Sequence, residues 1–304
     1  MKTKLFMLGL IILAMANLET RAQVTLSDTI YKAFDGKGNA VTLDEIVHAM
    51  STSDVVFLGE EHDDAVAHAI QAELFRRAVA SYSPQRRVAL SLEMFERDVQ
   101  TVVDEYLKGL ISEQHFLLSS RPWGNYKTDY RPLVELAKEK GLAVIAANAP
   151  RRYVNMVSRS GRDSLNGLSK EAKSWLAPLP YPEASKTYAD KFVKLMSAAG
   201  DPAASKDPAR FVHPQALWDA TMADSIANYL SKNKGSLVVH LNGGFHTEGR
   251  LGTVEQLLHY RPKARVIVVT LKSEKDFQTF DPSRHTALGD FVVLTDASQP
   301  KSRR

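Results

Sequence analysis

Five short apolar runs constrain the fold of this chain more than any other feature of its sequence. The runs occupy residues 55–58, 88–92, 143–147, 237–241 and 265–271. Continuous apolar runs of this length, separated by segments with helical patterns, are typical of strands buried on both faces of a mostly parallel sheet. The sequence therefore predicts an α/β fold, with residues 291–294 as a last edge strand.

The segments between the first runs have the patterns of helices. Asp63 or Asp64 is placed to cap a helix that ends near Tyr82, and Asp98 to cap the next one. Pro132 occupies the first turn of a third helix, where its missing N–H costs nothing. We expect these helices to flank the sheet.

A long segment then interrupts this alternation. From about Pro150 to Lys234 no run predicts a strand, whereas 188–198 and 214–230 have helical spacing. We predict an all-helical subdomain inserted before the last strands of the sheet domain. The expected units are a signal peptide (1–22), a sheet domain (23–149 and 235–297), the helical subdomain (150–234) and a basic, frayed tail (298–304).

The first residues have the pattern of a secretory signal peptide. Lys2 and Lys4 precede an apolar run over 5–16, and a small-x-small cleavage pattern ends at Ala22. The run is too short for a stable bilayer span, although a retained anchor is the alternative. The chain has no cysteine, which excludes a lipoprotein anchor, disulfides and thiolate metal sites. We expect an exported protein, periplasmic or extracellular, that does not span the membrane.

Charge and motifs narrow the function. Removal of residues 1–22 lowers the net charge from +4 to +2, so the folded body offers no general basis for binding nucleic acid. The sequence contains no Gly-x-Gly-x-x-Gly, P-loop, His-Glu-x-x-His or Gly-x-Ser-x-Gly motif. Nucleotide hydrolysis and serine-type acyl transfer therefore lack sequence support.

Polar residues follow four of the predicted strands. His62, Glu93, Asn148 and His246 come just after these runs, and both histidines belong to Gly-x-x-His turns. Ligands of open α/β sheets bind beyond the carboxyl ends of the strands, so we expect these side chains to share one edge. Helix N-termini after the first strands would favour an anion there.

This constellation has three interpretations. His62, Glu93 and His246 could hold a divalent metal, or they could act as base, acid and orienting group without one, with Glu60 and Arg97 completing a candidate catalytic set. In the structural alternative, Arg97 and Arg152 neutralise Glu60 and Glu93 in an ionic network at the sheet edge. His68 fits no ligand spacing, and we interpret it as a surface or packing residue.

Several runs resemble the ChaN family. They are residues 58–63, 92–100, 121–126, 129–132 and 146–152 and the closing Gly-x-x-His, in order between Val55 and Leu251. ChaN-like proteins are exported haem-binding proteins of iron uptake, and they share a superfamily with Tiki metalloproteases, TraB proteins and erythromycin esterases. The resemblance implies a parallel sheet with a smaller helical domain, haem between the subunits of a homodimer, iron bound by a tyrosine, propionates held by basic residues, and a link to an outer-membrane haem uptake system.

The helical segment supplies candidates for that cofactor site. Tyr188 opens an amphipathic stretch suited to a porphyrin, and Tyr181 is the second candidate ligand; ordinary packing is the alternative for either. The candidates for the propionates are Lys186, Lys191 and His213.

Two functions follow. The first is an exported haem-binding protein with Tyr-ligated haem at a dimer interface. The second is a hydrolase, peptidase or esterase, that uses His62, Glu93 and His246 with or without a divalent metal. The two are not exclusive, because the sites could lie in different parts of the chain.

Overall fold

A single eight-stranded sheet organises the computed structural model, which describes residues 24–198 and 208–302. The predicted signal peptide lies outside the described residues. The strand order is β2-β1-β8-β7-β3-β6-β4-β5. The strands are β1 (Tyr31–Asp35), β2 (Ala40–Val41), β3 (Val55–Glu60), β4 (Val88–Glu96), β5 (Ala143–Asn148), β6 (Leu237–Gly243), β7 (Val266–Glu274) and β8 (Phe291–Asp296).

Pairing in the sheet is mostly parallel, which confirms the predicted fold class. The strands from β8 to β5 pair in parallel, whereas β1 pairs antiparallel with both β2 and β8. The prediction that 291–294 forms an edge strand is wrong, because β8 lies between β7 and β1. No pattern in the sequence indicated this hairpin, because β2 has only two residues and β1 is only partly buried.

Eleven labelled α-helices accompany the sheet in the described part of the chain. They are α1 (Leu43–Ala49), α2 (Ala65–Tyr82), α3 (Gln100–Leu107), α4 (Glu113–Ser120), α5 (Arg131–Glu139), α6 (Arg151–Ser160), α7 (Lys170–Ser174), α8 (Lys186–Ala198), α10 (Pro208–Lys232), α11 (Thr253–Tyr260) and α12 (Pro282–His285). Asp64 caps α2 by accepting hydrogen bonds from the N–H groups of Val66 and Ala67. Asp98 does not cap a helix as predicted: α3 begins two residues later, and Asp98 pairs with Arg121 and Arg152 instead.

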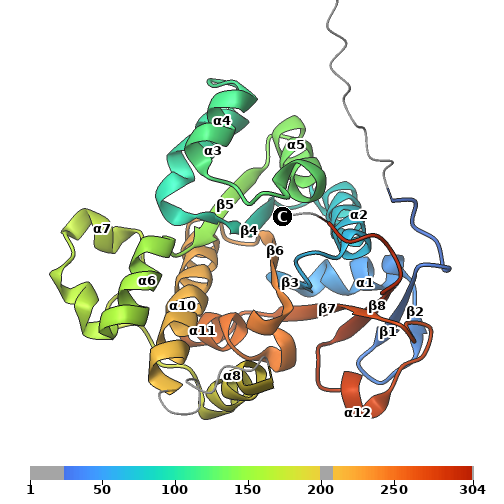
Figure 1. Cartoon of the computed structure of the whole chain (residues 1–304). Helices are drawn as coiled ribbons and strands as arrows, with labels where there is room; N and C mark the ends of the chain where they lie inside the picture. The colour runs from blue at the N-terminus through green and yellow to red at the C-terminus, as the bar shows by residue number, and fades with distance from the viewer. Residues whose placement is uncertain (1–23, 199–207, 303–304) are drawn as a thin grey trace, which may run out of the picture.

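Helices cover both faces of the sheet (Figure 1). Successive side chains of β3 alternate between the two faces, as a strand requires. Val56 and Leu58 belong to the core formed with helices such as α1, α2 and α5, and Val55 and Phe57 to the core formed with α10 and α11. Both faces are therefore apolar, which explains why the strands appear in the sequence as uninterrupted apolar runs.

In its described residues, the segment between β5 and β6 contains helices and no strand, and it has a core of its own. That core includes Tyr153 of α6, Leu176 just after α7, and Leu217 of α10. The second half of α10, however, packs on the sheet through residues such as Ile226. The predicted subdomain thus shares its longest helix with the sheet domain. No helix in the described part of the chain combines the length and apolar character that a bilayer span requires.

The predicted fraying of the tail is wrong for its described residues. After β8 the chain passes back beside α2 (Figure 1). Lys301 forms a β-bridge with Asp64, and Ser302 is only 6% exposed. The basic composition of the tail did not indicate this packing, because it depends on Ser302. The backbone N–H of Ser302 donates to the Asp63 carbonyl, and its hydroxyl donates to Asp129.

Candidate functional site

A cleft of about 840 Å³ lies at the carboxyl edge of β3, β6 and β7. The turns after β3 and β6, the end of α8 and a strand residue of β7 form its walls. The side chains that line it include His62, Lys191, Lys194, Leu195, Phe245 and Lys272. The place is the one that open α/β sheets use for ligands, and the volume falls within the range of small-molecule sites, roughly 300–1,000 Å³.

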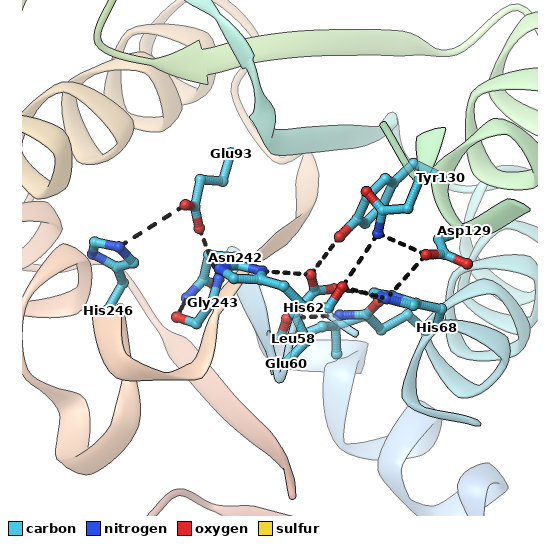
Figure 2. Close-up of polar contacts among 12 residues, drawn as sticks. Leu58, Glu60, His62, His68, Glu93, Asp129, Tyr130, Asn242, Gly243 and His246 are labelled. Carbon is cyan, nitrogen blue, oxygen red and sulfur yellow. Dashed lines mark hydrogen bonds and ion pairs between the residues drawn. The ribbon is translucent and has the colours of Figure 1, made fainter. Parts of the chain in front are cut away.

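One polar cluster lies on the α2 side of this edge; we call it the Glu60 cluster, and it consists of Glu60, His62, His68, Asp129 and Tyr130. The Glu60 carboxylate is buried, and its Oε1 accepts hydrogen bonds from His62 Nδ1 at 2.9 Å and the Tyr130 hydroxyl at 2.5 Å (Figure 2). His68 lies with Nδ1 3.2 Å from Glu60 Oε2 and Nε2 3.4 Å from Asp129 Oδ2. A buried imidazole therefore bridges two buried carboxylates.

The charges in this cluster stabilise one another. Burial opposes the charged form of Glu60, but attraction to His68 and hydrogen bonds from His62 and His68 lower its pKa to about 2. Burial likewise opposes the charged form of His68, yet Glu60 and then Asp129 raise its pKa to about 9. At neutral pH the core of the cluster is thus an imidazolium between carboxylates.

The interpretation of His68 as a mere surface or packing residue is wrong. It lies in the first turn of α2, from which its side chain reaches back to the end of β3. Asp129 and Tyr130 were also missed as site residues, although they belong to a run that carries the family resemblance. A helix that begins directly after a functional strand end was the signal, because its first turn must face that edge.

His62 and Glu60 of this cluster line the cleft, and His62 is the one of the two whose side chain is accessible. Its side chain is 27% exposed, and its ring packs edge-on against Trp123 with centroids 4.7 Å apart. The ring also lies against Gly243, where an added Cβ would come within 2.8 Å of His62 Nε2. The close imidazole, and not the backbone conformation (φ −59°), therefore favours glycine at this position.

A second polar cluster lies on the α10 side of the same edge; we call it the Glu93 cluster, and it consists of Glu93, Asp219, His240 and His246. Glu93 Oε2 accepts a hydrogen bond of 2.7 Å from the Gly243 N–H, and its Oε1 lies 3.9 Å from His246 Nε2 (Figure 2). His246 Nδ1 donates to Asp219 Oδ1 at 2.8 Å. All four side chains are buried.

Electrostatics distinguish the two histidines of this cluster. Burial favours a neutral ring in both, but Asp219 and Glu93 raise the pKa of His246 to about 9. His240 has no carboxylate partner; burial, helped by nearby His246, lowers its pKa to about 3, and it hydrogen-bonds to Ser91 Oγ. His246 is thus a buried imidazolium like His68.

The predicted edge constellation comes together around Gly243, but not as a metal site. His62 and Glu93 both contact Gly243, and Asn148 donates from Nδ2 to the Glu93 carbonyl at 3.0 Å. Among the described residues, no group of three or more His, Asp or Glu side chains is arranged to hold a metal ion. The proposed ligand set of His62, Glu93 and His246 therefore does not fit a divalent metal in this arrangement.

Arg97 lies away from both clusters. Its guanidinium, buried between strand and helix, pairs with Asp224 and donates to Ser225 and to backbone carbonyls, which ties the end of β4 to α10. The ionic network expected between Arg97, Arg152 and the carboxylates of Glu60 and Glu93 is likewise replaced: Arg97 pairs with Asp224 and Arg152 with Asp98. The expected anion site at the start of α2 is also occupied, because Asp64 takes its N–H groups.

Of the five candidate cofactor residues, only Lys191 lines the cleft. Tyr181 is buried and donates its hydroxyl proton to the His213 carbonyl, and Lys186 is exposed and pairs with Asp190. Tyr188 is fully buried, and burial together with Asp219 raises its pKa well above 10. Both effects oppose formation of the phenolate that would bind ferric iron.

The cleft also contains cationic groups that the sequence analysis missed. Lys191 and Lys272 lie on either side of Glu248, with Nζ–Oε distances of 3.1 and 3.2 Å. Lys272 follows the apolar run of β7 directly, and this strand-end position was the available signal. Lys194, one turn after Lys191 on α8, is exposed on the cleft wall.

Comparison with known proteins settles the kinship of this chain. Residues 46–257, well over half of the sequence, match the family described as haem-binding uptake, Tiki superfamily, ChaN. The chain belongs to this family. The resemblance inferred from the sequence runs is therefore confirmed, and with it membership of a haem-binding uptake family.

Individual relatives of this ChaN-like protein are distant. A solved structure described as cofacial heme binding to ChaN of Campylobacter jejuni superimposes with a TM-score of 0.69 at 18% identity, over 88% of this chain and 98% of that one, which shows a shared fold. Protein RETICULATA-RELATED 5, chloroplastic, of Arabidopsis thaliana is 25% identical over 265 residues, 82% of this chain. The chain spans about a third (35%) of that protein's length.

Proposed function

We propose that this ChaN-like protein binds haem in the cleft beside His62. The single observation that carries the proposal is the cleft itself, which combines an accessible imidazole, apolar surface from Phe245 and Leu195, and lysines. Haem presents an apolar macrocycle, an iron that takes axial ligands and two carboxylates, so this chemistry fits its parts.

His62 is the candidate axial ligand. Glu60 holds its Nδ1–H at 2.9 Å, which fixes the tautomer whose Nε2 is free to ligate. A carboxylate on the far nitrogen also makes an imidazole a stronger ligand. Among the described residues that line the cleft there is no tyrosine.

The lysines are candidates for the propionates. Lys191 is partly buried, and burial lowers its pKa even though Glu248 pulls in the opposite direction. A bound carboxylate would replace Glu248 as partner for Lys191 or Lys272, while Lys194 is exposed toward the same space. The site therefore offers cations at the place where the propionates would lie.

The wider proposal retains three expectations from the sequence. We propose export through the signal peptide, delivery to or from an outer-membrane haem uptake system, and a homodimer that covers the cleft. Leu195 on the cleft wall supports the homodimer, because this large apolar side chain is 50% exposed in the single chain. Ligation by Tyr188 or Tyr181 is the alternative to His62, and it requires a rearrangement that brings a buried hydroxyl to the cleft.

Titration of the purified protein with haemin tests this function. We expect a saturable Soret shift that His62→Ala weakens and changes in shape, that Lys191→Ala weakens moderately, and that the matched exposed control Lys186→Ala leaves unaltered. Absence of a saturable shift in the wild type would refute haem binding. Loss of the shift in Tyr188→Phe, with His62→Ala unaffected, would instead assign the iron to Tyr188.

A second candidate function is a metal-independent hydrolase. The observation that favours it is the His62–Glu60 pair, in which a carboxylate orients an accessible imidazole as a general base requires. Peptide and ester substrates should be compared for the wild type, His62→Ala and His246→Ala, with and without manganese or zinc. Equal background rates in all three proteins would remove this candidate.

A further inference from the structure

The described part of the C-terminal tail, residues 298–302, holds the turn that carries His62. The Ser302 N–H donates to the Asp63 carbonyl at 2.7 Å, and Lys301 forms its β-bridge with Asp64. Thr295, at the end of β8, donates its hydroxyl proton to the Asp64 carboxylate, the same group that caps α2. Both residues after His62 are therefore fixed by the last part of the chain.

The side chain of Ser302 continues this contact into the Glu60 cluster. Its hydroxyl donates to Asp129 Oδ1 at 3.0 Å. The other oxygen of Asp129 accepts from Asn125 Nδ2 at 2.6 Å and lies 3.4 Å from His68 Nε2. Asn125 Nδ2 also lies 3.2 Å from the His62 carbonyl.

These contacts form a continuous series. It runs from Ser302 through Asp129 and His68 to Glu60, and ends at the imidazole of His62. Every member except His62 is at least nine-tenths buried. A change at Ser302 thus has a physical route to His62, although the two residues are far apart in the sequence.

We propose that the C-terminal tail is a positioning element for His62, and that the Ser302–Asp129 hydrogen bond sets the tautomer and orientation of its imidazole. The physical reason is that Asp129 without Ser302 has an unpaired oxygen in the interior. It can then rotate toward another donor, which weakens the hold of His68 on Glu60 and of Glu60 on Nδ1 of His62. The effect on haem affinity rests on the proposed function; the effect on the imidazole does not.

Four substitutions test the proposal. Ser302→Ala removes the hydrogen bond, Ser302→Asp sets a carboxylate against Asp129, and Ser302→Thr restores the hydroxyl. Ser298→Ala is the matched control, because Ser298 lies in the same tail but is exposed, and its hydroxyl donates to Asp296 at the end of β8, away from the Glu60 cluster. Each full-length protein is examined without haem by ¹⁵N NMR of the histidine rings, and then by haemin titration.

We expect the wild type, Ser302→Thr and Ser298→Ala to hold neutral His62 in the Nδ1–H tautomer. Ser302→Ala and Ser302→Asp should show mixed tautomers and about tenfold weaker haemin binding, in the range that supporting residues of metal ligands produce. An unchanged tautomer in folded Ser302→Ala and Ser302→Asp would overturn the proposal, even if the melting temperature fell, since that would mean a stability role alone. If Ser302→Asp does not fold, Ser302→Ala against Ser302→Thr decides.

The two proposals fail separately. A wild type that binds no haemin refutes the proposed function, but the ring spectra of the protein without haem still decide the role of the tail. Conversely, haemin binding that is intact in every tail variant, with an unchanged tautomer, refutes only the tail.

Discussion

The Glu60 and Glu93 clusters contain the same electrostatic arrangement on opposite faces of one sheet edge. In each, two carboxylates surround a buried histidine and raise its pKa to about 9. They differ in what that imidazolium supports. His68 acts on Glu60, which holds the accessible ring of His62, whereas His246 and its partners are all buried. The same arrangement of charges therefore supports the accessible His62 ring in the Glu60 cluster, and only buried side chains in the Glu93 cluster.

Gly243 separates the two clusters and also joins them. Its N–H binds Glu93, and its α-carbon faces the ring of His62. Both clusters contain a buried, charged histidine, so such a histidine does not by itself identify a functional site. Connection to a solvent-exposed side chain distinguishes the functional face.

The largest expected effect is loss of a buried charge. His68→Ala leaves Glu60 and Asp129 without their common partner, and removal of one partner of a buried ion pair costs about 3–5 kcal/mol of unfolding free energy. Urea denaturation measures this loss of unfolding free energy. The control is His115→Ala, because His115 is exposed. A loss as small as that of the control would show that the cluster is not an ion pair.

The next effect concerns the residue between the clusters. Gly243→Ala introduces a Cβ 2.8 Å from His62, and overpacking of this kind costs about 1–3 kcal/mol. We expect weaker haemin binding as well, because the ring must move. Gly235→Ala, with open space around the added carbon but a strained positive φ, should lower stability without changing haemin affinity. Equal haemin binding by Gly243→Ala and the wild type would contradict the packing argument.

Haemin affinity should separate the two faces directly. His62→Ala should weaken binding at least about tenfold, or ~1.4 kcal/mol, whereas His246→Ala should keep binding at a lower melting temperature. Spectrophotometric titration of both variants gives the comparison. The opposite order would move the haem to the Glu93 cluster.

A further effect, measured across pH, is a dependence of stability on pH that the two clusters share. The folded pKa values of His68 and His246, about 9, exceed the ordinary 6.5, so their contributions are complete below pH 6.5 and are lost as pH rises toward 9. That of Glu60, at about 2, is complete above pH 4.5 and is lost toward pH 2. Chemical denaturation across pH 5–9 should show this alkaline loss, and either His68→Gln or His246→Gln should reduce it by about half. An unchanged slope in both variants would contradict these assignments.

Sequence patterns predicted the parts of this molecule that repeat. The apolar runs identified the parallel strands, and the residues after them, His62, Glu93 and His246, identified the edge. Local patterns could not assign β8 to the interior of the sheet, because that depends on a short hairpin elsewhere in the chain. They did not place His68 or Asp129 in the site either: the signal for His68 was its position in the first turn of the helix after β3, and Asp129 follows no strand.

The tyrosine candidates show a different limit. Amphipathic spacing placed Tyr188 on the apolar face of α8 correctly, but the same spacing fits a core residue, and the ring is fully buried. Whether the apolar face of a helix lines a cleft or packs into the protein core depends on its contacts with segments that are distant in the sequence. Propensity and periodicity carry no information about that choice.

Contacts of the tail join residues far apart in the sequence: Lys301 and Asp63 of the His62 turn are 238 positions apart, and Ser302 and Asp129 are 173 positions apart. Loops of that length close late in folding, so the ligand-facing turn should be among the last parts of the molecule to order. The same geometry has a practical side. A purification tag placed close after Ser302 in the sequence would add chain directly to the residue whose contacts hold the turn that presents His62, so haemin titrations need protein that is tagged elsewhere.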